Sequence, residues 1–104
     1  MLDGAGRAIY FSRSPIPYRR DKSPDLPTYR HHGLYGYRRD ALLRFVASPP
    51  APLEVAEGLE QLRALHIGER IAVVVTAEPS VGIDTREQAD ALERQLLATP
   101  SQIA

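Results

Sequence analysis

The sequence contains no cysteine and no long hydrophobic run. Without cysteine, disulfide bonds and thiolate chemistry are excluded. The longest mostly apolar stretch, residues 71–77, is far shorter than the ~20 residues that a membrane-spanning helix needs. The first residues include Asp3 and Arg7 and lack the apolar core of a signal peptide. We therefore expect a protein of the cytoplasm with no membrane partner.

The formal net charge is zero, but the charges are unevenly distributed. Residues 1–44 carry nine Lys or Arg against four Asp, whereas residues 45–104 carry four Arg against nine Asp or Glu. All five tyrosines lie in the basic part. Arginines among aromatic residues can bind nucleic acid, although two oppositely charged faces that offset each other explain the pattern equally well. Because no helix-turn-helix, zinc or RNA-binding signature is present, we expect no nucleic-acid partner.

The order of expected elements is that of an α/β protein. A length of 104 residues and a hydrophobic content of 43% fit one globular domain. We expect the domain to span residues 1–98 and the tail, residues 99–104, to be disordered. Strands are predicted over residues 8–13, 32–37 and 71–77, and a Pro-rich loop over residues 14–28. Helices are predicted from Asp40 to the residues before Pro49, over 53–67 and over 86–97.

Two of these helices have clear end signals. Pro52 lies near the first turn of the helix over residues 53–67, and Gly68 is placed to cap its C-terminus. Thr85 and Gln88 form a capping box at the start of the last helix. The helix over 53–67 has an apolar stripe at helical spacing, with a second set of residues on another face. The stripe comprises Val55, Leu59, Leu62 and His66, and the other face comprises Glu57, Glu60, Gln61 and Ala64.

Asp84, Glu60 and Gln61 are candidates for chemistry. Asp84 follows Gly82 on a short loop before a helix cap, where a carboxylate could either bind Mg²⁺ or help to start the helix. Glu60 and Gln61 are adjacent and could together read the hydroxyls of a sugar acid. The alternative is an exposed helix face on which Glu60 pairs with Arg63.

The basic part of the chain offers further candidates. His31 and Tyr35 lie four residues apart and can share one face of a strand, whereas His31 and His32 point to opposite faces and make a poor metal pair. Arginines on the Pro-rich loop, such as Arg20, could bind a carboxylate through a bidentate fork or simply aid solubility. No Ser/His/Asp triad and no phosphate loop of the Gly-x-x-x-x-Gly-Lys type is present.

Four motifs occur in order along the chain: residues 10–18 (YFSRSPIPY), 30–38 (RHHGLYGYR), 59–63 (LEQLR) and 82–85 (GIDT). Together they resemble the C-terminal half of 3-deoxy-manno-octulosonate (Kdo) cytidylyltransferases, the CMP-Kdo synthetases. The resemblance runs from about Ala8 to about Leu97. It implies an enzyme that transfers CMP from CTP to Kdo for lipopolysaccharide biosynthesis and releases pyrophosphate.

The resemblance also implies roles for individual residues. Asp84 would be a ligand of Mg²⁺ together with an aspartate from the other half of the enzyme. Arg20, His31, Tyr35, Glu60 and Gln61 would contact Kdo. The chain departs from the family pattern at His32, Arg86 and Gln88, where an aliphatic residue, a proline and an acid are usual. His32 is expected to face a more polar environment than the usual aliphatic residue and is assigned no role, and the other two departures bear on the start of the last helix.

The implied fold is the C-terminal portion of a three-layer, nucleotide-diphospho-sugar transferase-like domain, with an incomplete sheet and a homodimeric state. Family members are considerably longer, and their CTP-binding half would precede Met1. We therefore expect the chain alone to be inactive, and unpaired strand edges to favour self-association. Two alternatives are a stand-alone Kdo-binding or dimerisation module and a fragment of a related cytidylyltransferase that activates sialic acid.

Overall fold

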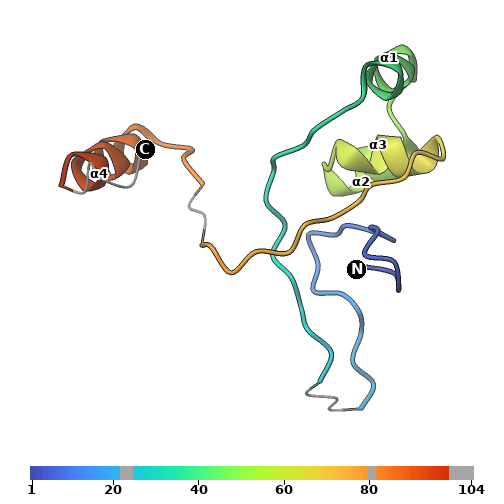
Figure 1. The fold of residues 1–104 in the computed structure, drawn as a ribbon, viewed down its shortest axis with the longest axis horizontal. Coiled ribbons are helices and arrows are strands. Elements are labelled where there is room, and N and C mark those ends of the chain that lie inside the picture. Colours follow the sequence, from blue (N-terminus) through green and yellow to red (C-terminus); the bar gives the residue numbers. More distant parts are fainter. Residues whose placement is uncertain (22–24, 80–81, 99–104) are drawn as a thin grey trace.

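The computed structural model of the chain describes residues 1–21, 25–79 and 82–98. Helices α1, α2 and α3 lie together, α4 stands apart on an arm of its own, and the N-terminal segment passes beside α2 and α3 (Figure 1). A second arm, formed by the Pro-rich loop, extends away from the helices (Figure 1). The helix bounds in the described residues are α1 Arg39–Ala47, α2 Pro52–Glu57, α3 Gln61–His66 and α4 Arg86–Ala98.

Helix α1 confirms the helix predicted from Asp40. Asp40 lies in its first turn, where a carboxylate interacts favourably with the unpaired amides, and its Oδ1 accepts a hydrogen bond from the Ala41 N–H. Arg44 lies one turn later and pairs with Asp40 at 3.5 Å. The helix ends at Ser48 because Pro49 and Pro50 follow. Its one buried side chain is Phe45, which faces α3.

The single helix predicted over residues 53–67 is wrong, because the chain forms two helices there. Gly58 adopts a left-handed conformation with φ of 61° and ψ of 38°, which ends α2. The N–H groups of Gly58 and Leu59 both bond to the Glu54 carbonyl. Gly68, with φ of 87°, follows the end of α3 as expected. The periodicity of the sequence does not reveal the break at Gly58, since a glycine inside a helical pattern is tolerated.

The break also changes which side chains are buried. Gln61, Leu62 and Ala64 of α3 are buried, whereas Val55 of α2 is 70% exposed. The predicted stripe is therefore correct at Leu62 and wrong at Val55, and Gln61 lies inside rather than on a polar face. Because Gly58 rotates α3 relative to α2, one 3.6-residue period does not describe both helices.

The strands predicted over residues 8–13, 32–37 and 71–77 do not assemble into a sheet in the described residues. Two isolated antiparallel bridges join Leu2 to Ala8 and Arg7 to Ala72. The Ala8 N–H bonds to the Ile71 carbonyl at 2.8 Å, and the Val73 N–H bonds to the Gly6 carbonyl at 3.0 Å. A few such bonds do not stabilise a sheet in water, so these segments run as irregular chain (Figure 1).

A hydrogen-bonded turn lies at the start of the chain, and the described residues of the predicted Pro-rich loop follow it without regular secondary structure. Asp3 Oδ1 accepts hydrogen bonds from the Ala5 and Arg7 amides, and Gly6 has a φ of 76°. In the loop arm, Arg19 Nη2 donates to the Leu26 carbonyl at 2.6 Å and to Thr28 Oγ1 at 2.7 Å. Arg19 therefore braces the two sides of this arm.

Helix α4 confirms the last predicted helix to within one residue. The Gln88 N–H bonds to Thr85 Oγ1, and the Thr85 N–H bonds to Gln88 Oε1, as the capping box requires. None of its described side chains is buried, and Leu97 is 75% exposed. The predicted disordered tail, residues 99–104, lies outside the described residues. No helix in the described ranges is long and apolar enough to span a membrane.

Candidate functional site

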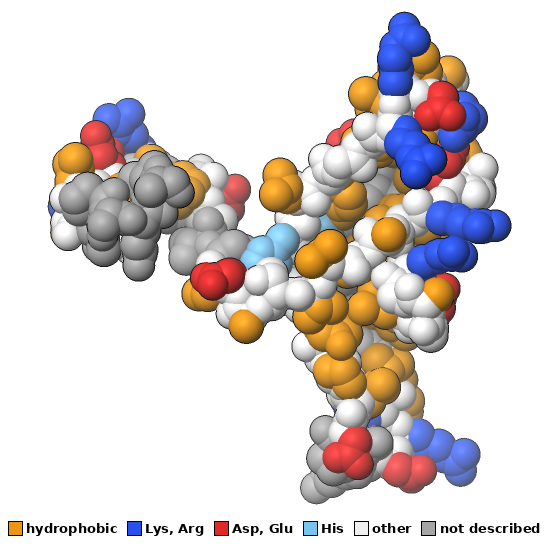
Figure 2. Space-filling view, viewed as in Figure 1, with side chains coloured by type: hydrophobic (Ala, Val, Ile, Leu, Met, Phe, Trp, Pro, Cys, Tyr) orange, Lys and Arg blue, Asp and Glu red, His pale blue; other side chains and the backbone are white. Residues whose placement is uncertain are grey.

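An open cleft of about 1250 Å³ lies between the segment that precedes α1 and the segment that follows α3. Aromatic residues line one side of it and the apolar segment over residues 71–75 lines the other. Hydrophobic side chains gather through this central body and along the loop arm, with histidine exposed where the body meets the α4 arm (Figure 2). The aromatic lining comprises Phe11, Tyr29, His31, Tyr35, Tyr37 and Phe45.

His31 and Tyr35 form the central polar pair of this cleft. His31 Nε2 and the Tyr35 hydroxyl are hydrogen-bonded, and their ring centroids lie 5.5 Å apart. The two residues were predicted to share one face of a strand. The segment is not a strand, and its irregular backbone brings the two side chains into direct contact instead. The pair presents one ring nitrogen and one hydroxyl, which together can donate to and accept from a ligand oxygen.

The surroundings keep both groups uncharged at neutral pH. Burial, and then the nearby His32, lower the pKa of His31 below its ordinary value. Burial, and then Tyr37, raise the pKa of Tyr35 to about 12. A neutral imidazole beside a protonated phenol favours recognition of hydroxyl or carboxylate oxygens by hydrogen bonding.

A series of aromatic contacts extends from this pair in both directions. On one side, Tyr35 and Tyr37 lie 6.4 Å apart and Tyr37 and Phe45 lie 5.8 Å apart. On the other side, Phe11 meets the His31 ring edge-on at 5.2 Å. Such separations fall within the range of favourable ring–ring packing. The rings therefore connect the N-terminal segment to α1.

Arg63 and Glu54 form a fork that the sequence analysis missed. Arg63 Nε donates to Glu54 Oε2 at 2.9 Å, and Nη2 donates to Oε1 at 2.6 Å. The two side chains are only 17% and 12% exposed. The hydrogen bonds from Arg63 lower the pKa of Glu54. Glu60, the partner considered for Arg63, lies on the exposed side instead, because the break at Gly58 brings Glu54 to Arg63.

Glu57 anchors the N-terminal segment and was also missed. Its Oε1 accepts from Ser12 Oγ at 2.8 Å, and this hydrogen bond lowers its pKa. Arg13 Nε donates to the Glu57 carbonyl at 2.6 Å, and Arg13 Nη2 donates to the Gly58 carbonyl at 2.8 Å. No sequence signal indicates these contacts, because they join residues more than forty positions apart.

Glu60 and Gln61 do not present a joint polar surface. Glu60 precedes α3 and is exposed, whereas Gln61 is only 7% exposed. Gln61 Nε2 is buried without a hydrogen-bond partner among the described residues. A buried unpaired amide is costly, so a group that accepts from it would stabilise the protein. Neither residue lines the cleft beside His31.

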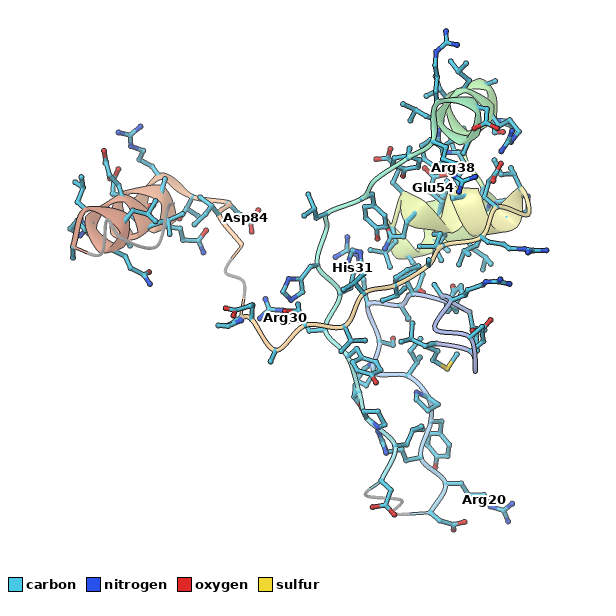
Figure 3. All side chains as sticks on the ribbon, viewed as in Figure 1. Arg20, Arg30, His31, Arg38, Glu54 and Asp84 are labelled. Carbon is cyan, nitrogen blue, oxygen red and sulfur yellow. The ribbon has the colours of Figure 1, made fainter. Side chains whose placement is uncertain are left out.

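Arg20 and Asp84 lie far from His31. Arg20 is exposed near the end of the loop arm, and Asp84 lies before α4 on the other arm (Figure 3). The structure of the chain therefore brings His31 and Tyr35 together. It does not bring Arg20, Glu60, Gln61 or Asp84 to them.

The described residues do not form a complete metal site. They include no group of three or more His, Cys, Asp or Glu side chains able to hold a metal ion. Asp84 is a single exposed carboxylate, whose backbone N–H bonds to Gln88 Oε1 at 2.7 Å. One carboxylate fits a shared Mg²⁺ site, in which substrate phosphates and further groups supply the remaining oxygens. One carboxylate does not fit a Mg²⁺ site whose ligands all come from the described side chains of this chain.

Comparison with known proteins identifies the family. The cytidylyltransferase family profile matches residues 1–71. The chain belongs to this family. It is 52% identical over 94 residues to the 3-deoxy-manno-octulosonate cytidylyltransferase of Chlorobaculum tepidum, a match that covers 90% of the chain. It is 53% identical over 99 residues to that of Solibacter usitatus, covering 95% of the chain.

The resemblance inferred from the four motifs is thus confirmed. The match to the enzyme of the same name from Geobacter sulfurreducens is 53% identical over 95 residues and covers 82% of the chain. The chain spans only 38–39% of the length of these three relatives. More than half of each relative therefore has no counterpart in this sequence.

Proposed function

We propose that the chain supplies the sugar-acid side of a cytidylyltransferase that converts CTP and Kdo into CMP-Kdo and pyrophosphate. The observation that supports this most strongly is its identity of about 50% to enzymes of that name over most of its length. In the reaction, the anomeric hydroxyl of Kdo forms a bond to the α-phosphorus of CTP. The bond from that phosphorus to the β-phosphate oxygen breaks, and pyrophosphate leaves. The product would serve lipopolysaccharide biosynthesis in the cytoplasm.

His31, Tyr35 and Gln61 would hold the sugar acid. His31 and Tyr35 are neutral and face an open cleft, so they can bond to hydroxyl or carboxylate oxygens. The buried Nε2 of Gln61 has an unused donor that a substrate oxygen would satisfy. Glu60 and Arg20 complete the proposed set. Gln61, Glu60 and Arg20 all lie outside the cleft lining in this structure, so binding would require their segments to come closer to His31.

Asp84 would contribute one ligand to Mg²⁺. The metal would neutralise phosphate charge during the transfer. The residues that grip CTP and the partner carboxylate would belong to the part of the relatives that this chain does not match. The chain by itself would therefore bind without turnover, and its functional form would be a homodimer.

A hybrid enzyme tests the proposal. In the Chlorobaculum tepidum relative, the 94 matched residues are replaced by the corresponding residues of this chain. Pyrophosphate release is then measured with CTP, Kdo and Mg²⁺. We expect release that requires all three components. A hybrid that folds, as judged by circular dichroism, but releases no pyrophosphate would reject the proposed function.

A second candidate is a Kdo-binding module without turnover, which the open cleft beside the hydrogen-bonded His31 and Tyr35 favours. Calorimetric titration of the chain with Kdo separates the two. Binding by the chain combined with an inactive hybrid would favour the module. A parallel titration with sialic acid tests the alternative that the chain belongs to a cytidylyltransferase that activates sialic acid.

A further inference from the structure

Two series of contacts lead from carboxylates of α2 to the His31–Tyr35 pair. From Glu54, contacts run through Arg63 and Phe45 to the tyrosines and reach His31. From Glu57, contacts run through Ser12 to the segment that carries Phe11, which packs against His31. Both ends of the series therefore lie on one short helix, α2 (Pro52–Glu57).

The step from Arg63 to Phe45 joins the polar fork to the aromatic rings. The Arg63 guanidinium carbon lies 4.6 Å from the centroid of the Phe45 ring, which is only 5% exposed. A guanidinium above a ring face is attracted by the ring quadrupole, more strongly where water is excluded. The Glu54 fork fixes the plane of the guanidinium, because two parallel hydrogen bonds allow one orientation.

Glu54 is itself held in place. Its Oε2 accepts the Ala51 N–H at 2.8 Å in addition to the Arg63 Nε. This bond ties the carboxylate to the first turn of α2, and Ala51 is fully buried. The fork thus joins the start of α2 to α3, on either side of the break at Gly58. In Figure 3, Glu54 lies within the helical cluster, away from the His31 region that it would influence.

We infer that Glu54 and Arg63 are positioning residues that orient His31 and Tyr35 for the sugar acid through Phe45 and Tyr37. Neither residue lines the cleft, so neither is expected to touch the ligand. The inference rests on the proposed function for the identity of the ligand, but the orientation of the pair can be measured without any ligand.

The first readout is the NMR titration of the His31 ring in the 104-residue chain. His32, Tyr35 and Tyr37 are the titratable groups that act on the pair, and burial is the main influence on the His31 pKa. In Arg63→Lys the charge remains, but the fork and the flat stacking surface are lost. The rings should loosen and admit water, so the His31 midpoint should rise towards 6.5.

Arg86→Lys is the matched control. Arg86 also pairs with an acid in its own region, Asp90 at 3.1 Å, but its side chain is 86% exposed and contacts no ring in the described structure. Its substitution should leave the His31 midpoint unchanged. If circular dichroism shows that Arg63→Lys does not fold, the His31 midpoint is measured in Phe45→Leu instead. This substitution interrupts the ring series and leaves the fork intact. An unchanged His31 midpoint in a folded Arg63→Lys or Phe45→Leu chain would overturn the inference.

The second readout is kinetic and uses the hybrid enzyme. Loss of oriented ligand contacts should raise KM for Kdo about tenfold in Arg63→Lys, with kcat and KM for CTP little changed. Equal changes in both KM values would indicate general damage and count against positioning. A shifted His31 midpoint in an inactive hybrid would reject the proposed function while the positioning role stands.

Discussion

At the residue scale, the folded structure disfavours the charged form of His31. Burial and the neighbouring His32 lower its pKa, so the folded chain binds a proton less readily than the unfolded chain. This contribution to stability is complete above the unfolded pKa of 6.5 and is lost as the pH falls through the lower, folded value. The pKa values of Glu54 and Glu57 are lowered from 4.5, so the stability that these carboxylates contribute is lost only in that more acidic range.

We therefore expect the free energy of unfolding to decrease as the pH falls below 6.5, before the carboxylates titrate. His31→Gln should flatten this part of the profile because it removes the titrating group. Urea denaturation at a series of pH values measures the slope. An identical slope in His31→Gln would show that another group is responsible.

Asp84 provides the residue-scale test of the metal site. In the hybrid enzyme, Asp84→Asn should lower kcat by about a hundredfold or more, because an amide is a weaker Mg²⁺ ligand than a carboxylate. Initial rates over a range of Mg²⁺ concentrations measure the effect. Asp90→Asn in α4 is the control, since Asp90 pairs with Arg86 and should keep near-normal turnover. Near-normal turnover in Asp84→Asn would remove the metal role.

At the scale of elements, the turn between α2 and α3 decides which side chains meet. Gly58 permits the left-handed conformation that brings Arg63 to Glu54, and Arg13 donates to its carbonyl. A Cβ at this position would lie 3.6 Å from the Arg13 guanidinium, an ordinary contact. The cost of substitution therefore comes from the backbone conformation rather than from crowding.

Gly58→Ala should destabilise the chain by about 1–2 kcal/mol, the cost of a left-handed conformation for a residue with a Cβ. Chemical denaturation followed by circular dichroism at the helix band measures the change. Gly36→Ala is the control, because a Cβ there meets nothing within 4 Å and Gly36 has no positive φ. Equal effects of the two substitutions would contradict the role of the turn.

At the scale of the whole molecule, the chain exposes more surface than a self-contained domain. Its accessible surface is 8886 Å², whereas a folded monomer of 11.5 kDa exposes about 5,800 Å². Its radius of gyration is 17.0 Å, against about 13 Å for a compact domain of this length. The excess surface, roughly 3,000 Å², exceeds the roughly 1,000–2,500 Å² that each partner buries in an obligate interface. Val74, which is 90% exposed, illustrates it.

The isolated chain should therefore self-associate as its concentration rises. Sedimentation velocity measures this directly. Val74→Lys should weaken the association, since a lysine on an unpaired edge opposes edge-to-edge pairing. A single species of 11.5 kDa at every concentration would contradict the expectation. Leu97→Lys, on the separate α4 arm, tests whether the effect is specific to the segment after α3.

The sequence alone determined the features that depend on neighbouring residues. The start of α1 at Arg39, the Thr85–Gln88 capping box and the left-handed Gly68 follow from local hydrogen bonds and backbone preferences. The four motifs likewise indicated the family, which the comparisons confirmed. The His31–Tyr35 contact was not predictable, because residues four apart on the expected strand would lie about 13 Å apart. The contact forms because the segment is not a strand.

Only the tertiary structure decided the contacts between distant residues. The predicted helix over 53–67 divides at Gly58, and this places Gln61 inside and joins Arg63 to Glu54. The predicted strands form only isolated bridges in the described residues, because a sheet needs continuous pairing between distant segments, which no local pattern specifies. Local propensity fixes where an element begins and ends, but which side chains meet depends on how the chain turns between elements.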